Sequence, residues 1–457
     1  MHTFARLLVL ALMLSGCATL PDVDPWLRYG GAQAPDTSEI RKPLTQSQTD
    51  AVVAKLVPKG DDSDILQRQA ALEEAVAGTA LVPGNAVTLL NDGPATYRAM
   101  FQDIERAADH VNIEFYTIED DETGRRLAEL LIRKRSQGVA VNVIYDAVGS
   151  LRTPREYFDR LREAGVEILQ FNPVNPLEAK SGWRLNNRDH RKILIVDGKV
   201  AFTGGINISG VYSGGSVVSS ERGGGSPEPG WRDTNIRIAG PVVADIQRVY
   251  LATWEKQRGE PLKPRKWFPE LKPQGRQPAR VIASSPGDAV PAIYVTLVSA
   301  IRNAVRSVHL TMAYFAPDPQ TLEALKDAAA RGVEVKLILP SYTDFWGIFH
   351  AGRSHYADLL EAGVEIYERQ ERLLHSKTAV IDGIWSTVGS SNIDWRSFLH
   401  NDELNVVILG RDFGAQMEAA FRRDLDNSER VALDDWERRP LDARVKEWAA
   451  RFWEYWL

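Results

Sequence analysis

The chain has 457 residues, of which 44% are hydrophobic and 25% are charged, and its formal net charge is −6. This length is enough for two domains of ordinary size. A net negative charge without a long Lys/Arg run argues against a nucleic-acid-binding protein, which usually needs a basic surface to engage phosphates. The single cysteine, Cys17, excludes an internal disulfide framework.

The N-terminus has the pattern of a secretory signal. A short basic start precedes the apolar run 7–14, which is too short to span a bilayer. Residues 1–16 are therefore predicted to be a signal peptide. Residues 14–17 (LSGC) resemble the bacterial lipobox, in which the cysteine is lipidated, here Cys17. The alternative is an ordinary secretory signal that happens to contain a cysteine. The polar segment 17–78 is expected to be a tether followed by a leading helix.

The rest of the chain contains an internal repeat. The stretch 138–144 (GVAVNVI) recurs as 332–338 (GVEVKLI), and AGVEI occurs at both 164–168 and 362–366. Each half reads strand, helix, strand, helix, strand, which predicts an α/β protein with a mostly parallel sheet. We expect two α/β/α sandwich domains related by pseudo-twofold symmetry. The predicted segments are a first domain over 79–260, a proline-rich linker over 261–279, a second domain over 280–432 and an amphipathic helix over 433–457.

The strongest signal is a motif that occurs twice with matched spacing. In each copy a lysine follows a histidine by two residues, an aspartate follows the lysine by five, and an asparagine follows the histidine by 17. The two copies are His190, Lys192, Asp197 and Asn207, and His375, Lys377, Asp382 and Asn392. Each copy opens an apolar strand that ends at an Asp-Gly turn, so the histidine and lysine point to the same face.

Two imidazoles, two ammonium groups and two amides around one pocket suit a phosphodiester. Lysine and asparagine donate to non-bridging oxygens, while one histidine attacks phosphorus and the other protonates the departing oxygen. Each histidine also needs an acidic partner that holds its tautomer. Asp233 in the first half and Glu403 in the second are the candidates, each for the histidine of its own half. The motif aspartates Asp197 and Asp382 stay candidates, although their place at a strand end favours a structural role.

At these residues the chain resembles the phospholipase D superfamily, whose signature is the paired HxKxxxxD, and within it the bacterial cardiolipin synthases. The supporting stretches are 112–116 (NIEFY), 188–192 (RDHRK), 231–234 (WRDT), 389–397 (GSSNIDWRS) and 401–407 (NDELNVV). One departure is 311–315 (TMAYF), where the synthases usually have a proline before the tyrosine. The resemblance implies the phospholipase D fold with an active site between its halves, His190 as nucleophile and His375 as general acid. Ala18 after the lipidated cysteine implies sorting to the outer membrane, with the enzyme facing the periplasm.

We therefore predict a membrane-anchored phosphatidyltransferase that transfers a phosphatidyl group to phosphatidylglycerol through a phosphohistidine intermediate. The donor, phosphatidylglycerol or phosphatidylethanolamine, stays open, and no cofactor is expected because two transfers through one covalent intermediate need no metal. One alternative is a phospholipase D or other phosphodiesterase that uses water as acceptor. Another is an inactive lipoprotein that binds or tethers lipid. A metal site is disfavoured, because a lysine beside each histidine would repel a cation.

Aromatic residues gather in two further segments. The stretch 345–349 (FWGIF) could line an acyl groove. Near the C-terminus one helical face carries Val445, Trp448, Phe452, Tyr455 and Trp456. Such a helix can lie at a bilayer interface or can pack on the second domain as an ordinary amphipathic helix, and the sequence leaves both open.

Overall fold

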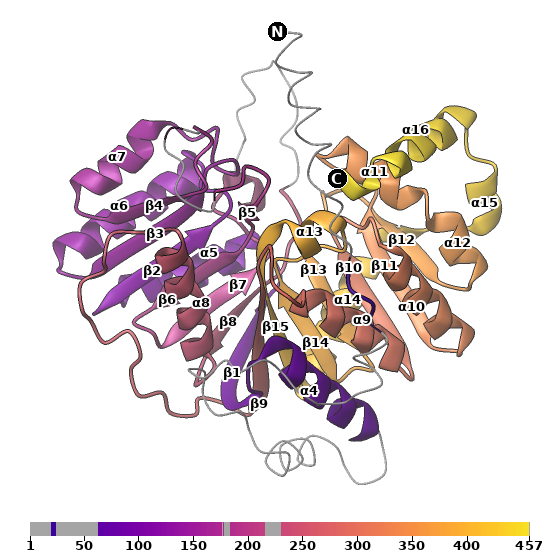
Figure 1. The fold of residues 1–457 in the computed structure, drawn as a ribbon, viewed down its shortest axis with the longest axis horizontal. Coiled ribbons are helices and arrows are strands. Elements are labelled where there is room, and N and C mark those ends of the chain that lie inside the picture. Colours follow the sequence, from indigo (N-terminus) through magenta and orange to yellow (C-terminus); the bar gives the residue numbers. More distant parts are fainter. Residues whose placement is uncertain (1–19, 24–62, 176, 178–182, 215–229, 457) are drawn as a thin grey trace.

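Figure 1 shows the computed structural model, which describes residues 20–23, 63–175, 177, 183–214 and 230–456. The predicted signal peptide, Cys17 and most of the predicted tether lie outside the described residues. Two lobes stand side by side in this view, each with helices packed over strands (Figure 1). No helix of the described ranges is long and apolar enough to cross a bilayer.

The strands are β1 (Val82–Leu90), β2 (His110–Phe115), β3 (Ala140–Asp146), β4 (Glu167–Phe171), β5 (Arg188–Asp189), β6 (Lys192–Val196), β7 (Val200–Gly204), β8 (Asn235–Ala239), β9 (Gln277–Ser284), β10 (Ser307–Met312), β11 (Glu334–Pro340), β12 (Glu365–Arg369), β13 (Lys377–Ile381), β14 (Trp385–Gly389), β15 (Asn401–Leu409) and β16 (Ser428–Arg430). The helices are α4 (Ser63–Ala77), α5 (Gly93–Glu105), α6 (Glu122–Ser136), α7 (Arg155–Glu163), α8 (Val243–Lys256), α9 (Ala292–Asn303), α10 (Pro319–Ala330), α11 (Trp346–Arg353), α12 (Tyr356–Glu361), α13 (Trp395–Leu399), α14 (Arg411–Leu425), α15 (Leu433–Glu437) and α16 (Leu441–Phe452), with 3-10 turns η2 (Gly210–Tyr212) and η3 (Glu454–Trp456).

The two halves repeat one arrangement of strands. In each half three strands are parallel, β2-β3-β4 in the first and β10-β11-β12 in the second. The strand that carries the HxK motif, β6 or β13, then pairs antiparallel with the first of these three. The repeat inferred from the sequence is therefore also a repeat of structure.

The sheet is mixed, so the prediction of a mostly parallel sheet was wrong. The order β16-β12-β11-β10-β13-β14-β15-β9-β1-β8-β7-β6-β2-β3-β4 contains more antiparallel than parallel neighbours. The reason is local, because a tight Asp-Gly turn after each HxK strand reverses the chain. Tight turns join antiparallel strands, whereas parallel strands need long crossovers.

Matched caps start the helix after the first strand of each parallel set. Asp121 accepts a hydrogen bond from the backbone N–H of Gly124 at 2.9 Å at the start of α6. Asp318 does the same for Gln320 at 2.9 Å at the start of α10. Such caps satisfy N–H groups that the first helical turn leaves without partners. Both helices therefore begin at the carboxyl edge of the parallel strands.

One continuous sheet joins the halves. β9 pairs with β15 on one side and with β1 on the other, so the second half continues directly into the first. β9 begins at Gln277, inside the segment predicted to be a linker, while residues 261–276 form no helix or strand. Buried apolar residues from both halves, such as Ile193 and Leu404, form one core at this junction. This shared core fixes the halves relative to each other.

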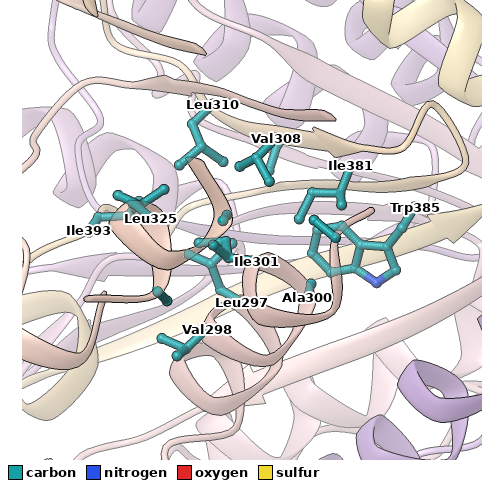
Figure 2. Packing of buried hydrophobic residues seen from close by; sticks show 14 of the residues in the cluster. Leu297, Val298, Ala300, Ile301, Val308, Leu310, Leu325, Ile381, Trp385 and Ile393 are labelled. Carbon is teal, nitrogen blue, oxygen red and sulfur yellow. The ribbon is translucent and has the colours of Figure 1, made fainter. Parts of the chain in front are cut away.

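The second half has its own core between the sheet and helices α9 and α10. Figure 2 shows Leu297 and Ile301 of α9 facing Val308 of β10 and Ile381 of β13. The leading helix α4 belongs to this core, although the chain passes next into the first half. Its Glu73 is buried, lies 3.1 Å from Arg280 and accepts a hydrogen bond from Trp385, so β9 and β14 hold α4 in place.

The C-terminal segment differs from the single helix expected over 433–457. It consists of α15, α16 and the turn η3. α16 packs against α11, and Ala450 joins Ile348 and Ala351 in a small apolar cluster. Figure 1 shows both helices above the carboxyl ends of β10 and β11.

Candidate active site

Both motif histidines face one cavity between the halves. Lys192 and Lys377 are the first residues of β6 and β13, which run antiparallel to β2 and β10. Their amino ends therefore lie at the carboxyl edge of the parallel strands. His190 and His375 line the same cavity of about 750 Å³ there. The prediction that the two histidines face one pocket is confirmed.

His190 is oriented by a carboxylate from the other half. Its Nδ1 lies 2.9 Å and 3.2 Å from the two carboxylate oxygens of Glu403, which is fully buried. Ser390 donates its hydroxyl to the same carboxylate at 2.5 Å, and Asn401 donates its amide at 3.2 Å. Because Nδ1 is engaged, the ring presents Nε2 as its free nitrogen.

His375 is oriented in the same way, also from the other half. Its Nδ1 lies 2.8 Å from a carboxylate oxygen of Asp233 and 3.2 Å from the hydroxyl of Tyr212. Asp233 in turn accepts the backbone N–H of Thr234 at 2.7 Å. Both acidic partners were predicted correctly, but each was predicted for the wrong histidine.

Backbone pairing between the halves explains this exchange. β5, just before His190, pairs in parallel with the start of β15, just before Glu403. The N–H of His190 donates to the carbonyl of Asp402 at 2.9 Å. In the same manner the N–H of His375 donates to the carbonyl of Arg232 at 2.8 Å. Each histidine thus sits beside the residue that precedes the other half's acid, and the two pairs exchange partners.

The two motif lysines are buried beside the histidines. Each Nζ donates to a backbone carbonyl two residues earlier, Lys192 to that of His190 and Lys377 to that of His375. Burial lowers the pKa of Lys192 to about 7 and that of Lys377 to about 8, although Glu403 and Asp233 oppose the change. The structure does not place either lysine in the lining of the cavity, but both buried amines lie beside the histidines, where an anionic ligand would stabilise their charged form.

Burial also lowers the pKa of both histidines. It lowers the pKa of His190 to about 4, against the effect of Glu403, and the ammonium groups of Lys192 and Lys377 lower it further. The pKa of His375 is lowered by the same two causes, burial and the nearby lysines. Burial alone would raise the pKa of Glu403, yet His190 and Lys192 bring it below its ordinary value. A neutral imidazole with a carboxylate at Nδ1 carries its lone pair on Nε2, as a nucleophile requires.

Both asparagines line the cavity as expected. Asn207 accepts the N–H of Thr117 at 3.1 Å and donates to the hydroxyl of Tyr212 at 3.2 Å. The side-chain oxygen of Asn392 is buried and has no hydrogen-bond partner among the described residues. Both amides therefore form part of the cavity wall.

The motif aspartates do not reach the cavity. Asp197 accepts the N–H groups of residues 108, 109 and 110 at 2.7–3.1 Å, and Asp382 accepts those of 305, 306 and 307 at 2.7–3.3 Å. Both have positive φ, 54° and 55°, at the far end of the HxK strand. Their candidacy as active-site residues is therefore corrected, and the structural role that the turn position favoured is confirmed.

Comparison with known proteins shows the family of the chain. Residues 100–212 and 297–425 match the family model described as "Cardiolipin synthase, PLD-like domain". The chain belongs to this family.

The relatives of this family are similar over most of the chain. Cardiolipin synthase of Geobacillus kaustophilus is 35% identical over 365 residues, which cover 79% of this chain and 70% of that protein. Cardiolipin synthase 2 of Bacillus anthracis is 34% identical over 361 residues and covers 78% and 68%. The crystal structure of phosphatidylserine synthase from Haemophilus influenzae has a TM-score of 0.60 at 12% identity, over 81% of this chain and 95% of that one. This last likeness shows the fold alone.

Within this PLD-like architecture, the sequence analysis gave no role to two tyrosines at the cavity. Tyr116 packs edge-on against His190, with ring centroids 5.1 Å apart, and Tyr314 does so against His375 at 6.2 Å. The ammonium of Lys192 lies over the Tyr116 ring at 5.3 Å. Each tyrosine follows the first parallel strand of its half, so their matched positions in the repeat were a usable signal.

Two arginines at the cavity were also missed. Arg188 and Arg396 both line it, and the positive charge of Arg396 contributes to the lowered pKa of Arg188. Burial is the main cause of that lowered pKa, and Asp146, at 3.4 Å, opposes it. Arg396 donates to the side-chain oxygen of Asn186 at 2.8 Å. These cations add to the positive potential of the cavity.

Proposed function

We propose that the chain is a phosphatidyltransferase of the cardiolipin synthase type, acting through a phosphohistidine intermediate. The observation that carries the proposal is the pair of buried histidines on one cavity, each held at Nδ1 by a carboxylate of the opposite half. Such an arrangement provides a nucleophile and a proton donor for the two sides of one phosphorus atom. The family relationship supports phospholipids as substrates.

In the first step the Nε2 of His190 attacks the phosphorus of the donor phospholipid. The bond from phosphorus to the head-group oxygen breaks, and His375 in its protonated form delivers a proton from Nε2 to that oxygen. The products are a free head-group alcohol, a phosphatidyl group bound to His190, and a neutral His375. Glu403 stabilises the positive charge that develops on the His190 ring, because its carboxylate lies 2.9 Å from Nδ1.

In the second step a hydroxyl of phosphatidylglycerol attacks the same phosphorus from the side of the departed alcohol. Neutral His375 removes the proton of this hydroxyl, and the bond from phosphorus to His190 breaks. Cardiolipin is released, His190 is neutral again and His375 is ready to donate. Asp233 stabilises protonated His375 from 2.8 Å.

Four side chains stabilise the charge on the phosphoryl oxygens. Lys192 and Lys377 lie two residues after the histidines on the same strand face, and Asn207 and Asn392 line the cavity. Preorganised donors in a buried site stabilise developing charge without the reorganisation that water requires. The proposed mechanism therefore runs on the chain's own residues, and we expect a metal chelator to leave the activity of purified protein unchanged.

Lipid analysis of a bacterial host that lacks its own cardiolipin tests this function. Expression of the chain is expected to produce cardiolipin, and the His375→Ala variant is expected to produce none. His309→Ala is a matched control, because His309 also contacts carboxylates, Glu334 and Glu418, but lies outside the cavity. Accumulation of phosphatidic acid without cardiolipin would instead assign the hydrolytic alternative, with water as acceptor.

We further infer that Cys17 is acylated and holds the enzyme on the outer membrane, facing the periplasm. The support is the sequence 14–17, which resembles a lipobox, and Ala18 after the cysteine. Radiolabelled palmitate is expected to enter the wild-type chain but not the Cys17→Ser variant, and membrane fractionation reads the location. Label in the variant, or wild-type protein in the inner membrane, would contradict this inference.

A further inference from the structure

Helix α16 turns its apolar face to solvent, whereas an ordinary surface helix turns that face to the core. It buries Glu447 and Ala450 against the protein. Its opposite face carries Leu441, Val445, Trp448 and Phe452, spaced by four, three and four residues, and these lie in solvent. Trp448 is 73% exposed and Phe452 is 75% exposed. Large aromatic side chains of a surface helix normally face the core, so this stripe requires another explanation.

Polar contacts hold the helix in this orientation. Arg439 donates to the buried Glu447 carboxylate at 2.9 Å and 2.7 Å. The guanidinium of Arg439 also lies over the ring of Trp436, 4.4 Å from its centroid, and that of Arg353 lies over the same ring at 4.7 Å. The stripe therefore faces outward because the ion pair of Arg439 with Glu447 holds the opposite face of α16 against the protein.

Further exposed apolar side chains surround the mouth of the catalytic cavity. Val148, Leu151 and Leu185 come from the first half, and Phe345 comes from the second; all four line the cavity. All four are exposed large hydrophobic residues, and so is Trp346 of α11. α11 packs directly on α16. α11 thus connects the mouth to α16, and we call the stripe and these five side chains together the apolar rim.

The apolar rim lies at a single end of the molecule. Its loops follow the carboxyl ends of β3 and β11, and Figure 1 shows α11 and α16 at the same edge as β5 and α13, which flank the cavity. The described N-terminal residues also reach this end, because Gln320, at the start of α10, accepts the N–H of Val23 at 2.9 Å and donates to the carbonyl of Pro21 at 2.9 Å. Three peptide units, at most about 11 Å, separate Leu20 from Cys17.

We propose that the apolar rim inserts into the interfacial region of an anionic phospholipid bilayer, so that lipid substrates enter the cavity without passing through water. The proposal rests on the proposed phospholipid substrates. Charge is complementary, because α16 carries the exposed cations Arg444, Lys446 and Arg451 against one exposed carboxylate, Asp442, which pairs with Lys446 at 2.9 Å. Trp and Phe on one face with basic residues beside them are typical of helices that lie in a bilayer interface.

A site-specific environmental probe tests the insertion. In the full chain with Cys17→Ser, Val445→Cys provides a single thiol on the stripe. Val305→Cys is the matched control, since Val305 is exposed and precedes β10, at the opposite end of the sheet from the cavity. With a polarity-sensitive fluorophore, phosphatidylglycerol vesicles are expected to shift the emission at 445 to the blue and to leave 305 unchanged. The proposal would be overturned if the vesicles changed the emission at 445 and at 305 to the same extent. It would also be overturned if a higher protein concentration without vesicles gave the same shift at 445.

Activity separates this inference from the proposed function. The double variant Trp448→Ser, Phe452→Ser is expected to lose about tenfold or more in kcat/KM on vesicles, because these two exposed aromatic side chains would contribute to membrane affinity when they insert into the bilayer. Its turnover of short-chain phosphatidylglycerol dissolved as monomers is expected to stay within about twofold of wild type. Unchanged activity on vesicles would contradict the role of the stripe. If the wild type turned over neither substrate, the proposed function would be contradicted. The fluorescence experiment would still show whether the apolar rim inserts into the bilayer.

Discussion

The two halves share a backbone plan but surround their histidines differently. Gly205 and Ser390 occupy matched positions two residues before the motif asparagine. A Cβ at Gly205 would lie 2.2 Å from Oδ1 of Asp233, so no side chain fits there. Ser390 instead donates a hydrogen bond to Glu403. Asp233, the shorter acid, lies directly against Gly205, whereas Glu403, the longer acid, leaves room for the hydroxyl of Ser390.

The two halves therefore hold similar sites in which the acids beside the histidines have different hydrogen-bond partners. Glu403 receives hydrogen bonds from Ser390 and Asn401 and contacts His190. Its pKa lies below the ordinary value despite burial, so it remains ionised beside His190. A firmly held carboxylate suits the histidine that becomes positively charged on attack. The asymmetry therefore supports His190 as nucleophile and His375 as the proton donor.

Replacing the histidines one at a time tests this assignment and has the largest expected effect. His190→Ala and His375→Ala are each expected to lower transfer by about 10⁴-fold or more. They differ with a phosphatidyl donor whose leaving group needs no proton, such as nitrophenol. His375→Ala is expected to form the covalent intermediate with this donor, seen by mass spectrometry of the intact protein, and His190→Ala is not. An adduct on His375 would reverse the roles.

The acidic partners test the exchange between the halves. Glu403→Gln and Asp233→Asn are each expected to lower the rate about 10²- to 10⁴-fold, because an amide no longer fixes the tautomer or the charge of the ring. Glu403→Gln should impair formation of the intermediate on His190, with the nitrophenyl donor, more than Asp233→Asn does. The opposite order would mean that each acid serves the histidine of its own half. Pre-steady-state release of nitrophenol measures this step.

The lysines give a moderate effect that depends on pH. Lys192, with a pKa of about 7, and Lys377, with a pKa of about 8, lose their protons as the pH rises through these values. An empty site then has less positive charge, so the KM for a soluble phosphodiester is expected to rise about tenfold between pH 7 and pH 9. The acid limb of kcat/KM is expected only near pH 4, where His190 becomes protonated. A flat KM over this range would contradict the role of the lysines.

Replacing the motif aspartates is expected to have the smallest effect on catalysis, and to lower stability by a similar amount in both halves. Asp197→Ala and Asp382→Ala each remove a carboxylate that accepts three backbone N–H groups. Each is expected to lower the free energy of unfolding by about 2–3 kcal/mol. The folded fraction should keep the wild-type kcat, because neither side chain lines the cavity. Urea unfolding and active-site titration with the nitrophenyl donor measure the two quantities.

Much of the site could be read from the sequence because its signals are local. A histidine and a lysine two residues apart on a strand share a face, whatever surrounds the strand. The matched spacing of His190 and His375 therefore indicated a shared site, and Asp233 and Glu403 were recognisable by their positions near it. Local turn chemistry also identified Asp197 and Asp382 as strand-closing residues. The direction of neighbouring strands was misjudged, because the hydrophobic pattern of a buried strand is the same in a parallel and an antiparallel pair.

The duplication, the two α/β halves and the side chains that they contribute to a phosphodiester site follow from local sequence patterns. Which acid meets which histidine depends on how the halves pack together, since 213 residues separate His190 from Glu403 and 142 separate His375 from Asp233. The tertiary structure also decided that the stripe on α16 faces outward. Periodicity shows that a helix has an apolar face, but what covers that face depends on contacts between distant segments, which no local pattern records.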